Sequence, residues 1–155
     1  LLQANGFTCL ADDFVPVDAE KRAVYSFPAA ISIKKNSVDT LLPFYPELAH
    51  AAEFHFKRLQ KIVRYLPPNN IDFLAHLPCK DLVFIKYEKE SYLDVQKIAQ
   101  LAAFQQLVPD AWLSPIVENA KVFLDWFSGL NCYQITYSDN AKMIAAVSKI
   151  FKGNL

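Results

Sequence analysis

Glycine is scarce in this chain: only three of its 155 residues are glycine, at positions 6, 129 and 153. A glycine-rich phosphate loop needs several closely spaced glycines, because its backbone must approach the ligand without Cβ atoms in the way. The 155 residues therefore contain no loop of this kind. They also lack the Gly-x-Ser-x-Gly turn that carries the nucleophile of the α/β-hydrolases.

Cysteine and histidine are equally sparse, with three residues of each type. The cysteines, Cys9, Cys79 and Cys132, are isolated and odd in number, which argues against a disulfide framework. This usage fits a reducing compartment, so we expect a cytoplasmic protein. The histidines lack the HxH or HxxxH spacing that is typical of metal ligands.

Neither sign of charge dominates, since 16 Lys and Arg residues balance 16 Asp and Glu residues. Such a chain has no global field to attract nucleic acid or an anionic membrane, and we expect neither as a partner. No apolar run reaches the roughly 18 residues of a membrane span. The chain is nevertheless 53% apolar and 14% aromatic, which predicts a packed single domain over residues 1–155.

Strand-like and helix-like segments alternate along the chain, which predicts an α/β fold. Strands are expected over residues 7–11 continuing into 14–17, over 23–27 in a hairpin with 30–33, and over 62–66, 82–87 and 132–137. Helices are expected over residues 37–42, 94–107, 114–129 and from Ser138 or Asp139 to Phe151, with serine or aspartate as caps. The stretch 54–66 is ambiguous between helix and strand, and the β-branched residues of 62–66 favour a strand for that part.

The first six residues have the pattern of a helix end. Two leucines precede Asn5-Gly6, and glycine suits the left-handed position that follows a helix C-terminus. The start of such a helix would lie before Leu1. We therefore expect the sequence to be a fragment and the fold to be incomplete at the N-terminus.

The most informative motif is the segment CLADDFVPVD, residues 9–18, in which an apolar stretch leads into Asp12 and Asp13. Adjacent carboxylates at a strand end are costly to place unless positive charge lies opposite them. Mg²⁺ bound to nucleotide phosphates supplies that charge in α/β phosphotransferases. The simpler interpretation is a strand-end turn with solvated carboxylates.

The tract NGFTCLADDFV, residues 5–15, resembles HPr kinase/phosphatase, in which a helix with a terminal glycine leads into an apolar strand and Ala-Asp-Asp. The remainder resembles the HPr-kinase-related proteins of the phosphoenolpyruvate carboxykinase-like superfamily. The matching segments are YSFPAAISIK (25–34), VRYLPP (63–68), FIKY (84–87) and CYQITYSD (132–139). The resemblance implies a P-loop, phosphoenolpyruvate carboxykinase-like mixed sheet with flanking helices, whose phosphate loop would fall just before Leu1.

The resemblance also implies an activity: an ATP-dependent kinase that phosphorylates a serine or another hydroxyl of a protein, peptide or small molecule. By position, Asp13 would orient or deprotonate the acceptor hydroxyl, and Asp12 would help to hold Mg²⁺. Lys34 and Arg64 are candidate contacts to phosphate or substrate; the alternative for both is an ordinary surface charge. The related kinase is a hexamer, which makes a homo-oligomer a possible state.

A second hypothesis is a catalytically inactive binding or scaffold module that keeps the kinase-like fold. It rests on the missing phosphate loop, whose backbone amides and lysine supply most phosphate binding. The 155 residues alone are expected to be inactive for the same reason. The segment EFHFKR, residues 53–58, either forms a basic rim to a substrate groove or is a solvated helix face.

Overall fold

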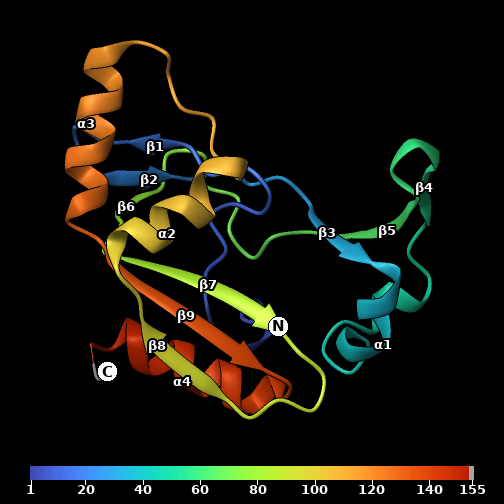
Figure 1. Cartoon of the computed structure of the whole chain (residues 1–155). Helices are drawn as coiled ribbons and strands as arrows, with labels where there is room; N and C mark the ends of the chain where they lie inside the picture. The colour runs from blue at the N-terminus through green and yellow to red at the C-terminus, as the bar shows by residue number, and fades with distance from the viewer. Residues whose placement is uncertain (154–155) are drawn as a thin grey trace. The chain divides into compact units, whose positions relative to one another are not determined.

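The computed structural model describes residues 1–153 and has a mixed α/β architecture, with three small sheets and four α-helices in that part of the chain (Figure 1). The chain divides into two compact units. Unit 1 comprises Leu1–Pro16 and Tyr25–His76, and unit 2 comprises Val17–Val24 and Leu77–Leu155. Each unit is thus assembled from two stretches of sequence. The single domain expected over residues 1–155 stays a prediction, because compact units are not by themselves independent folding domains.

Unit 1 is built on an antiparallel sheet with the order β3-β5-β4. Its strands are β3 (Ile31–Lys34), β5 (Lys61–Leu66) and β4 (Phe54–Phe56). The register places Ile33 opposite Arg64, and Val63 between Lys34 and Phe54. A small core forms where β3 and β5 meet α1 (Val38–Leu41) and the 3-10 helix η3 (Pro46–Ala49); its buried members are Ile33, Val38, Leu41, Leu48 and Leu66.

The N-terminal stretch of unit 1 confirms one prediction and corrects another. A 3-10 turn, η1 (Gln3–Asn5), ends at Gly6 with φ of 86°, the left-handed conformation expected there. Residues 7–16, all of which the structure describes, form no strand beyond an isolated bridge of Ala11 to Phe27. The reason is that the Asn69 side chain binds the backbone of this stretch, where a neighbouring strand would otherwise pair.

Unit 2 is built on a sheet with the order β7-β9-β8, in which β7 is parallel and β8 antiparallel to the central strand. The strands are β7 (Asp81–Tyr87), β8 (Asp94–Lys97) and β9 (Asn131–Tyr137). The helices are α2 (Gln100–Leu107), α3 (Val117–Ser128) and α4 (Asn140–Phe151). These elements confirm the strands expected over 82–87 and 132–137, the end of the third helix and the final helix.

The core of unit 2 lies on both faces of β9. Cys132 packs on one face with Ala103 of α2 and with Trp126 and Phe127 of α3. Because side chains alternate along a strand, Ile135 points to the other face, next to α4, and it is fully buried. Figure 1 shows the red helix α4 beside the strand. No helix among the residues that the structure describes is long and apolar enough to cross a bilayer.

Two predicted elements were wrong. The helix expected over 94–107 begins only at Gln100, because residues 94–97 form β8 and pair with the open edge of β9. The hairpin expected between 23–27 and 30–33 does not form: β2 (Ala23–Tyr25) pairs with β1 (Val17–Asp18) in a sheet ordered β1-β2-β6, where β6 is His76–Pro78. Between β2 and β3 the amide of Phe27 donates to the carbonyl of Leu10. This hydrogen bond directs the chain away from β2, so that β2 and β3 do not pair.

Candidate functional site

The acidic pair of the sequence lies in unit 1, against the outer edge of β3. One carboxylate oxygen of Asp12, Oδ2, accepts from the backbone amide of Ser32 at 2.9 Å and from the Ser32 hydroxyl at 3.3 Å. Asp13 Oδ2 also lies 3.4 Å from that hydroxyl. The bridge between Ala11 and Phe27 fixes the preceding backbone and so brings the pair to this strand. Both predicted site aspartates therefore converge on one serine.

The two carboxylates differ in their hydrogen bonds, because both lie near the single hydroxyl of Ser32. A serine hydroxyl carries one proton, so Ser32 can donate to only one carboxylate at a time. Asp12 keeps the backbone amide as a second donor and is half-buried, whereas Asp13 is exposed and has only the hydroxyl. Asp13 is consequently the more accessible member of the pair, whereas Asp12 has one oxygen, Oδ2, already engaged by Ser32.

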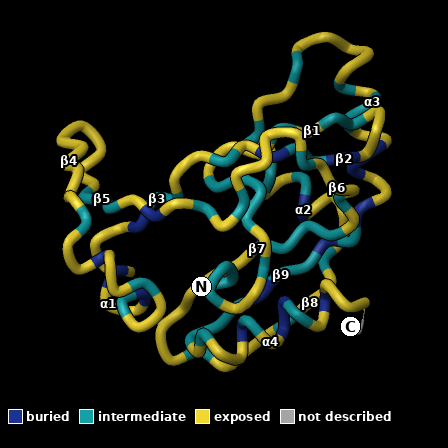
Figure 2. The backbone as a smooth tube through the Cα atoms, turned by 180° about the vertical axis from the view of Figure 1, so that it is seen from behind, coloured by how far each residue is buried: buried dark blue, intermediate teal, exposed yellow. Residues whose placement is uncertain are grey.

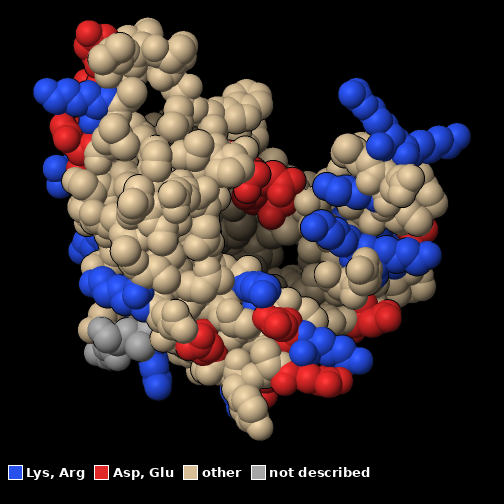
Figure 3. Space-filling view, in the orientation of Figure 1, with Lys and Arg blue, Asp and Glu red and all other residues tan. Residues whose placement is uncertain are grey.

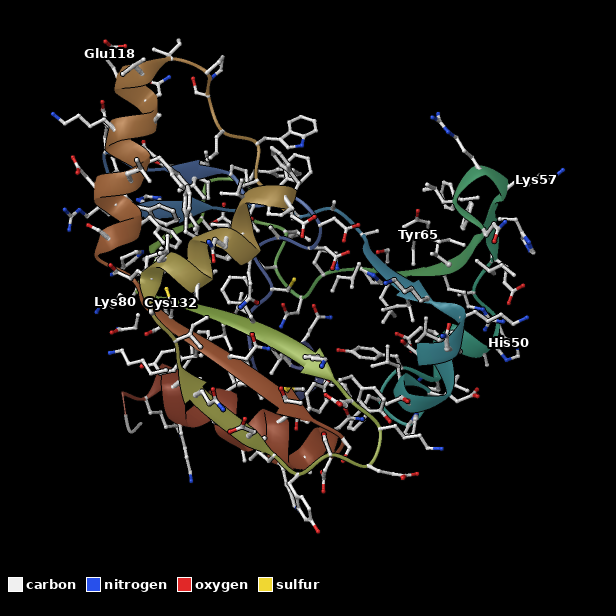
Figure 4. The ribbon with its side chains drawn as sticks, viewed as in Figure 1. His50, Lys57, Tyr65, Lys80, Glu118 and Cys132 are labelled. Carbon is white, nitrogen blue, oxygen red and sulfur yellow. The ribbon has the colours of Figure 1, made fainter. Side chains whose placement is uncertain are left out.

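Lys34 lies two residues beyond Ser32 on β3 and therefore on the same face of the sheet. Its side chain is exposed, and among residues 1–153 it has no ion-pair partner. Ser32 faces Tyr65 across the ladder, and the Tyr65 ring meets Phe54 edge-on with centroids 5.2 Å apart. Tyr65 lies on β5 and is labelled in Figure 4. The acidic pair thus adjoins a face that carries a free cation and two aromatic rings.

Arg64 is on the opposite face of the same ladder. It lies opposite Ile33, one of the core residues, and its guanidinium donates to the carbonyl of Leu48 and, at 3.1 Å, to Glu53 Oε1. The Arg64 side chain is only 20% exposed. The structure therefore does not bring Arg64 to the acidic pair, and its role as a phosphate or substrate contact stays a prediction.

The thiol nearest to the acidic pair is held neutral. Burial raises the pKa of Cys9 above its ordinary value, and the charge of Asp12 raises it further. The Cys9 thiol donates to the carbonyl of Ala11 at 3.3 Å. A neutral thiol is a poor nucleophile, so the carboxylates, and not Cys9, are the candidates for acid–base chemistry in this region.

Sequence reasoning missed Ser32 and Glu53. Ser32 is a polar residue between two isoleucines in a strand-like run, and that pattern alone gives no reason to link it with residues twenty positions earlier. Glu53 was noticed only as part of a basic segment, yet it is the ion-pair partner of Arg64. Both omissions concern partners brought together by the tertiary fold rather than by spacing in the chain: Ser32 by the approach of Asp12 to the edge of β3, and Glu53 by the pairing of β4 with β5.

The carboxylates of Asp12 and Asp13 could bind a metal ion only together with other ligands. In the part of the chain that the structure describes, no group of three or more His, Cys, Asp or Glu side chains is arranged to hold a metal ion. Mg²⁺ in phosphoryl-transfer sites is commonly bound by one or two carboxylates, with water and substrate phosphates completing its coordination. Asp12 and Asp13 fit that limited share of a magnesium–nucleotide site and not an independent metal site.

Comparison with known proteins yields no relative for this chain. No protein-family model, no curated protein and no solved structure matches it. The assignment of a function therefore rests on the geometry around the acidic pair and on the sequence motifs.

Proposed function

We propose that this chain carries the acceptor side of an ATP-dependent phosphotransferase related to HPr kinase, within a P-loop, phosphoenolpyruvate carboxykinase-like fold. The observation that carries the proposal is the convergence of Asp12 and Asp13 on Ser32, beside Lys34 on the same strand. A carboxylate pair next to an unpaired cation is the charge arrangement that a magnesium-bound phosphate and a reacting hydroxyl need.

Each residue has a defined role in this proposal. The exposed carboxylate of Asp13 accepts the proton of the acceptor hydroxyl, or orients that hydroxyl toward the phosphate. Asp12, held by Ser32, contributes an oxygen toward Mg²⁺ directly or through water. Lys34 neutralises charge on the transferred phosphoryl group. The bound magnesium nucleotide supplies the phosphoryl group and most of the charge opposite the aspartates.

Titration of Mg·ATP into the protein in its longest natural form tests this proposal. Asp12→Asn should weaken the magnesium-dependent part of binding, because an amide is a poorer ligand for Mg²⁺ than a carboxylate. Asp13→Asn should leave binding nearly unchanged and abolish transfer to a hydroxyl acceptor. Asp39→Asn, an exposed position on α1 of the same unit, is the matched control. Binding that does not depend on magnesium or on Asp12 would refute the proposal.

A second candidate is a binding or scaffold module without activity. The observation that favours it is that two predicted site residues already have structural partners: Asp12 binds the edge of β3, and Arg64 binds Leu48 and Glu53. In that case a well-folded protein would show no binding of Mg·ATP, and Asp12→Asn would change stability alone. The same titration therefore separates the two candidates.

A further inference from the structure

The hairpin formed by β4 and the start of β5 is exposed as far as Lys61, the first residue of β5. Residues 52–61, ten in succession, are all exposed, and Figure 2 shows this end of unit 1 as a continuous yellow stretch around β4. The turn is formed by the 3-10 helix η4 (Lys57–Leu59) followed by Gln60, whose φ is +49°. The segment that the sequence left undecided between helix and strand is thus a hairpin whose turn projects from the sheet.

Three large apolar side chains are exposed on this hairpin. Phe54 is 48% exposed, Phe56 43% and Leu59 60%, although each is a residue type that ordinarily packs inside a protein. Leu59 lies in the turn itself, and Phe56 is the last residue of β4 before it. Three such side chains together on a projecting turn indicate a surface that becomes covered when the protein binds something.

The same turn carries unpaired positive charge. Lys57, Arg58 and Lys61 are exposed and have no ion-pair partner among residues 1–153. Residues 54–61 contain no Asp or Glu, so their formal charge is +3. Figure 3 shows Lys and Arg side chains extending from this hairpin, and Figure 4 shows Lys57 directed away from the sheet. The overall neutrality of the chain concealed this local charge at the sequence level.

The end of β3 adds to this charge. Lys34 lies opposite Val63 and Lys35 follows it, so both are at the end of the sheet from which the turn projects. The turn also borders an open, shallow depression of about 570 Å³ lined by His55, Phe56, Lys57, Arg58 and Leu59. Its lining combines two cations with two apolar side chains, which suits an anionic headgroup attached to an apolar chain.

We propose that this hairpin, residues 54–61, binds an anionic lipid surface, with Leu59 and Phe56 entering the interface and Lys57, Arg58 and Lys61 contacting the lipid headgroups. Exposed apolar side chains alternating with cations on one turn are what such a surface selects, since burial and electrostatic attraction then act together. An acidic polypeptide would account for the cations, and the comparison with a soluble acidic polypeptide below separates it from a lipid surface. Nucleic acid would use planar rings for stacking, and the aliphatic side chain of Leu59 in the turn offers none, whereas it can enter an apolar interface.

Co-sedimentation of the full chain with vesicles tests the proposal. Binding should be strong with vesicles that contain phosphatidylserine, weak with pure phosphatidylcholine, and should fall as salt is added. The variant Lys57→Glu/Arg58→Glu should lose at least tenfold in vesicle affinity, since each basic residue near the surface contributes about a fivefold factor. Leu59→Asn, which keeps the charge, should lose severalfold because its apolar contribution is removed.

Matched variants in unit 2 serve as controls. Lys121→Glu/Lys142→Glu makes the same change in net charge at exposed positions of α3 and α4, and Leu101→Asn removes a leucine that is 69% exposed on α2. Both should bind vesicles like the unaltered protein. Absence of binding to anionic vesicles would overturn the proposal. So would unchanged binding by Leu59→Asn, or binding to a soluble acidic polypeptide that equals binding to vesicles, because either result would show attraction to charge alone.

Discussion

The carboxylate of Asp12 accepts two hydrogen bonds from Ser32, at 2.9 Å from its amide and at 3.3 Å from its hydroxyl. The amide in question belongs to the outer edge of β3, where it has no partner strand. An uncovered edge amide is a point of attachment for other chains, and a side chain that binds it closes that edge. The residue proposed as a magnesium ligand therefore also stabilises the fold.

Removing this carboxylate should destabilise unit 1. We expect Asp12→Ala to lower the free energy of unfolding by about 1–2 kcal/mol, because the amide and the hydroxyl of Ser32 lose a charged acceptor. Asp13→Ala should cost less than about 0.5 kcal/mol, since the carboxylate of Asp13 is exposed and adds only one long hydrogen bond. Denaturant unfolding followed by circular dichroism measures both. Equal losses for the two variants would contradict the unequal roles described for the pair.

Arg64 should behave as a structural residue. Arg64→Ala is expected to lower the free energy of unfolding by about 2–3 kcal/mol, because it leaves the Leu48 carbonyl and Glu53 without their donor and removes a side chain that packs near the core. Arg64→Lys should recover only part of the loss, since one ammonium cannot match the fork of the guanidinium. If Arg64→Ala left stability unchanged but weakened binding of Mg·ATP, the phosphate contact implied by the sequence would be the better account.

Stability should fall at alkaline pH. Burial raises the pKa of the Cys79 and Cys132 thiols above the ordinary 9.0, with Asp81 adding to the effect at Cys79, and it also raises the pKa of the Tyr137 hydroxyl. The folded chain therefore retains protons that the unfolded chain releases. The stabilising contribution is complete below pH 9.0 and is lost as pH rises through the folded-state values.

The free energy of unfolding measured at a series of pH values checks this sign. The decline should begin near pH 9.0 for the unaltered protein and be shallower for Cys79→Ala, which removes one of the raised groups. Reaction of the thiols with a disulfide reagent should be slow near neutrality for the same reason. A rise in stability between neutrality and pH 9.0 would show that other groups control the profile.

Asp139 should contribute about 1 kcal/mol through its cap of α4. Its carboxylate accepts from the amides of Ala141 at 2.8 Å and Lys142 at 3.2 Å. Asp139→Ala loses both bonds, whereas Asp139→Asn keeps an acceptor in place and should cost only a few tenths of a kcal/mol. Thermal unfolding of the two variants compares them directly, and an Asn variant as unstable as the Ala variant would mean that charge rather than hydrogen bonding matters there.

The sequence was sufficient to predict those secondary-structure elements whose conformation depends mainly on residues close together in the chain. The left-handed conformation of Gly6 was predicted correctly, although the element it ends is a 3-10 turn that begins at Gln3 and not a helix that starts before Leu1. The apolar run of β7 identified a strand, and Asp139, one of the two residues expected to cap α4, has that role. Each of these depends on neighbours in the chain. The general α/β class followed from their alternation.

Local signals failed where a distant partner decides the conformation. The segment 94–97 has helical spacing, yet the open edge of β9 draws it into β8. The apolar stretch 7–11 has the composition of a strand, yet the side chain of Asn69 takes up its backbone groups. The candidate site shows the same contrast: Asp12 and Asp13 are recognisable as a sequence motif, whereas Ser32 and Glu53 become partners only through contacts between distant segments of the fold.

The order β7-β9-β8 has a consequence for the sequence of events in folding. The central strand of unit 2, β9, is the last of the three to appear in the chain, and its pairing of Asp81 with Asn131 spans fifty residues. Until Tyr137 has been synthesised, β7 and β8 have no strand to join within this sheet, and long closures of this kind slow the search for native contacts. On the ribosome, β7 and β8 of unit 2 must therefore wait unpaired, whereas unit 1 has all of its residues once His76 has emerged.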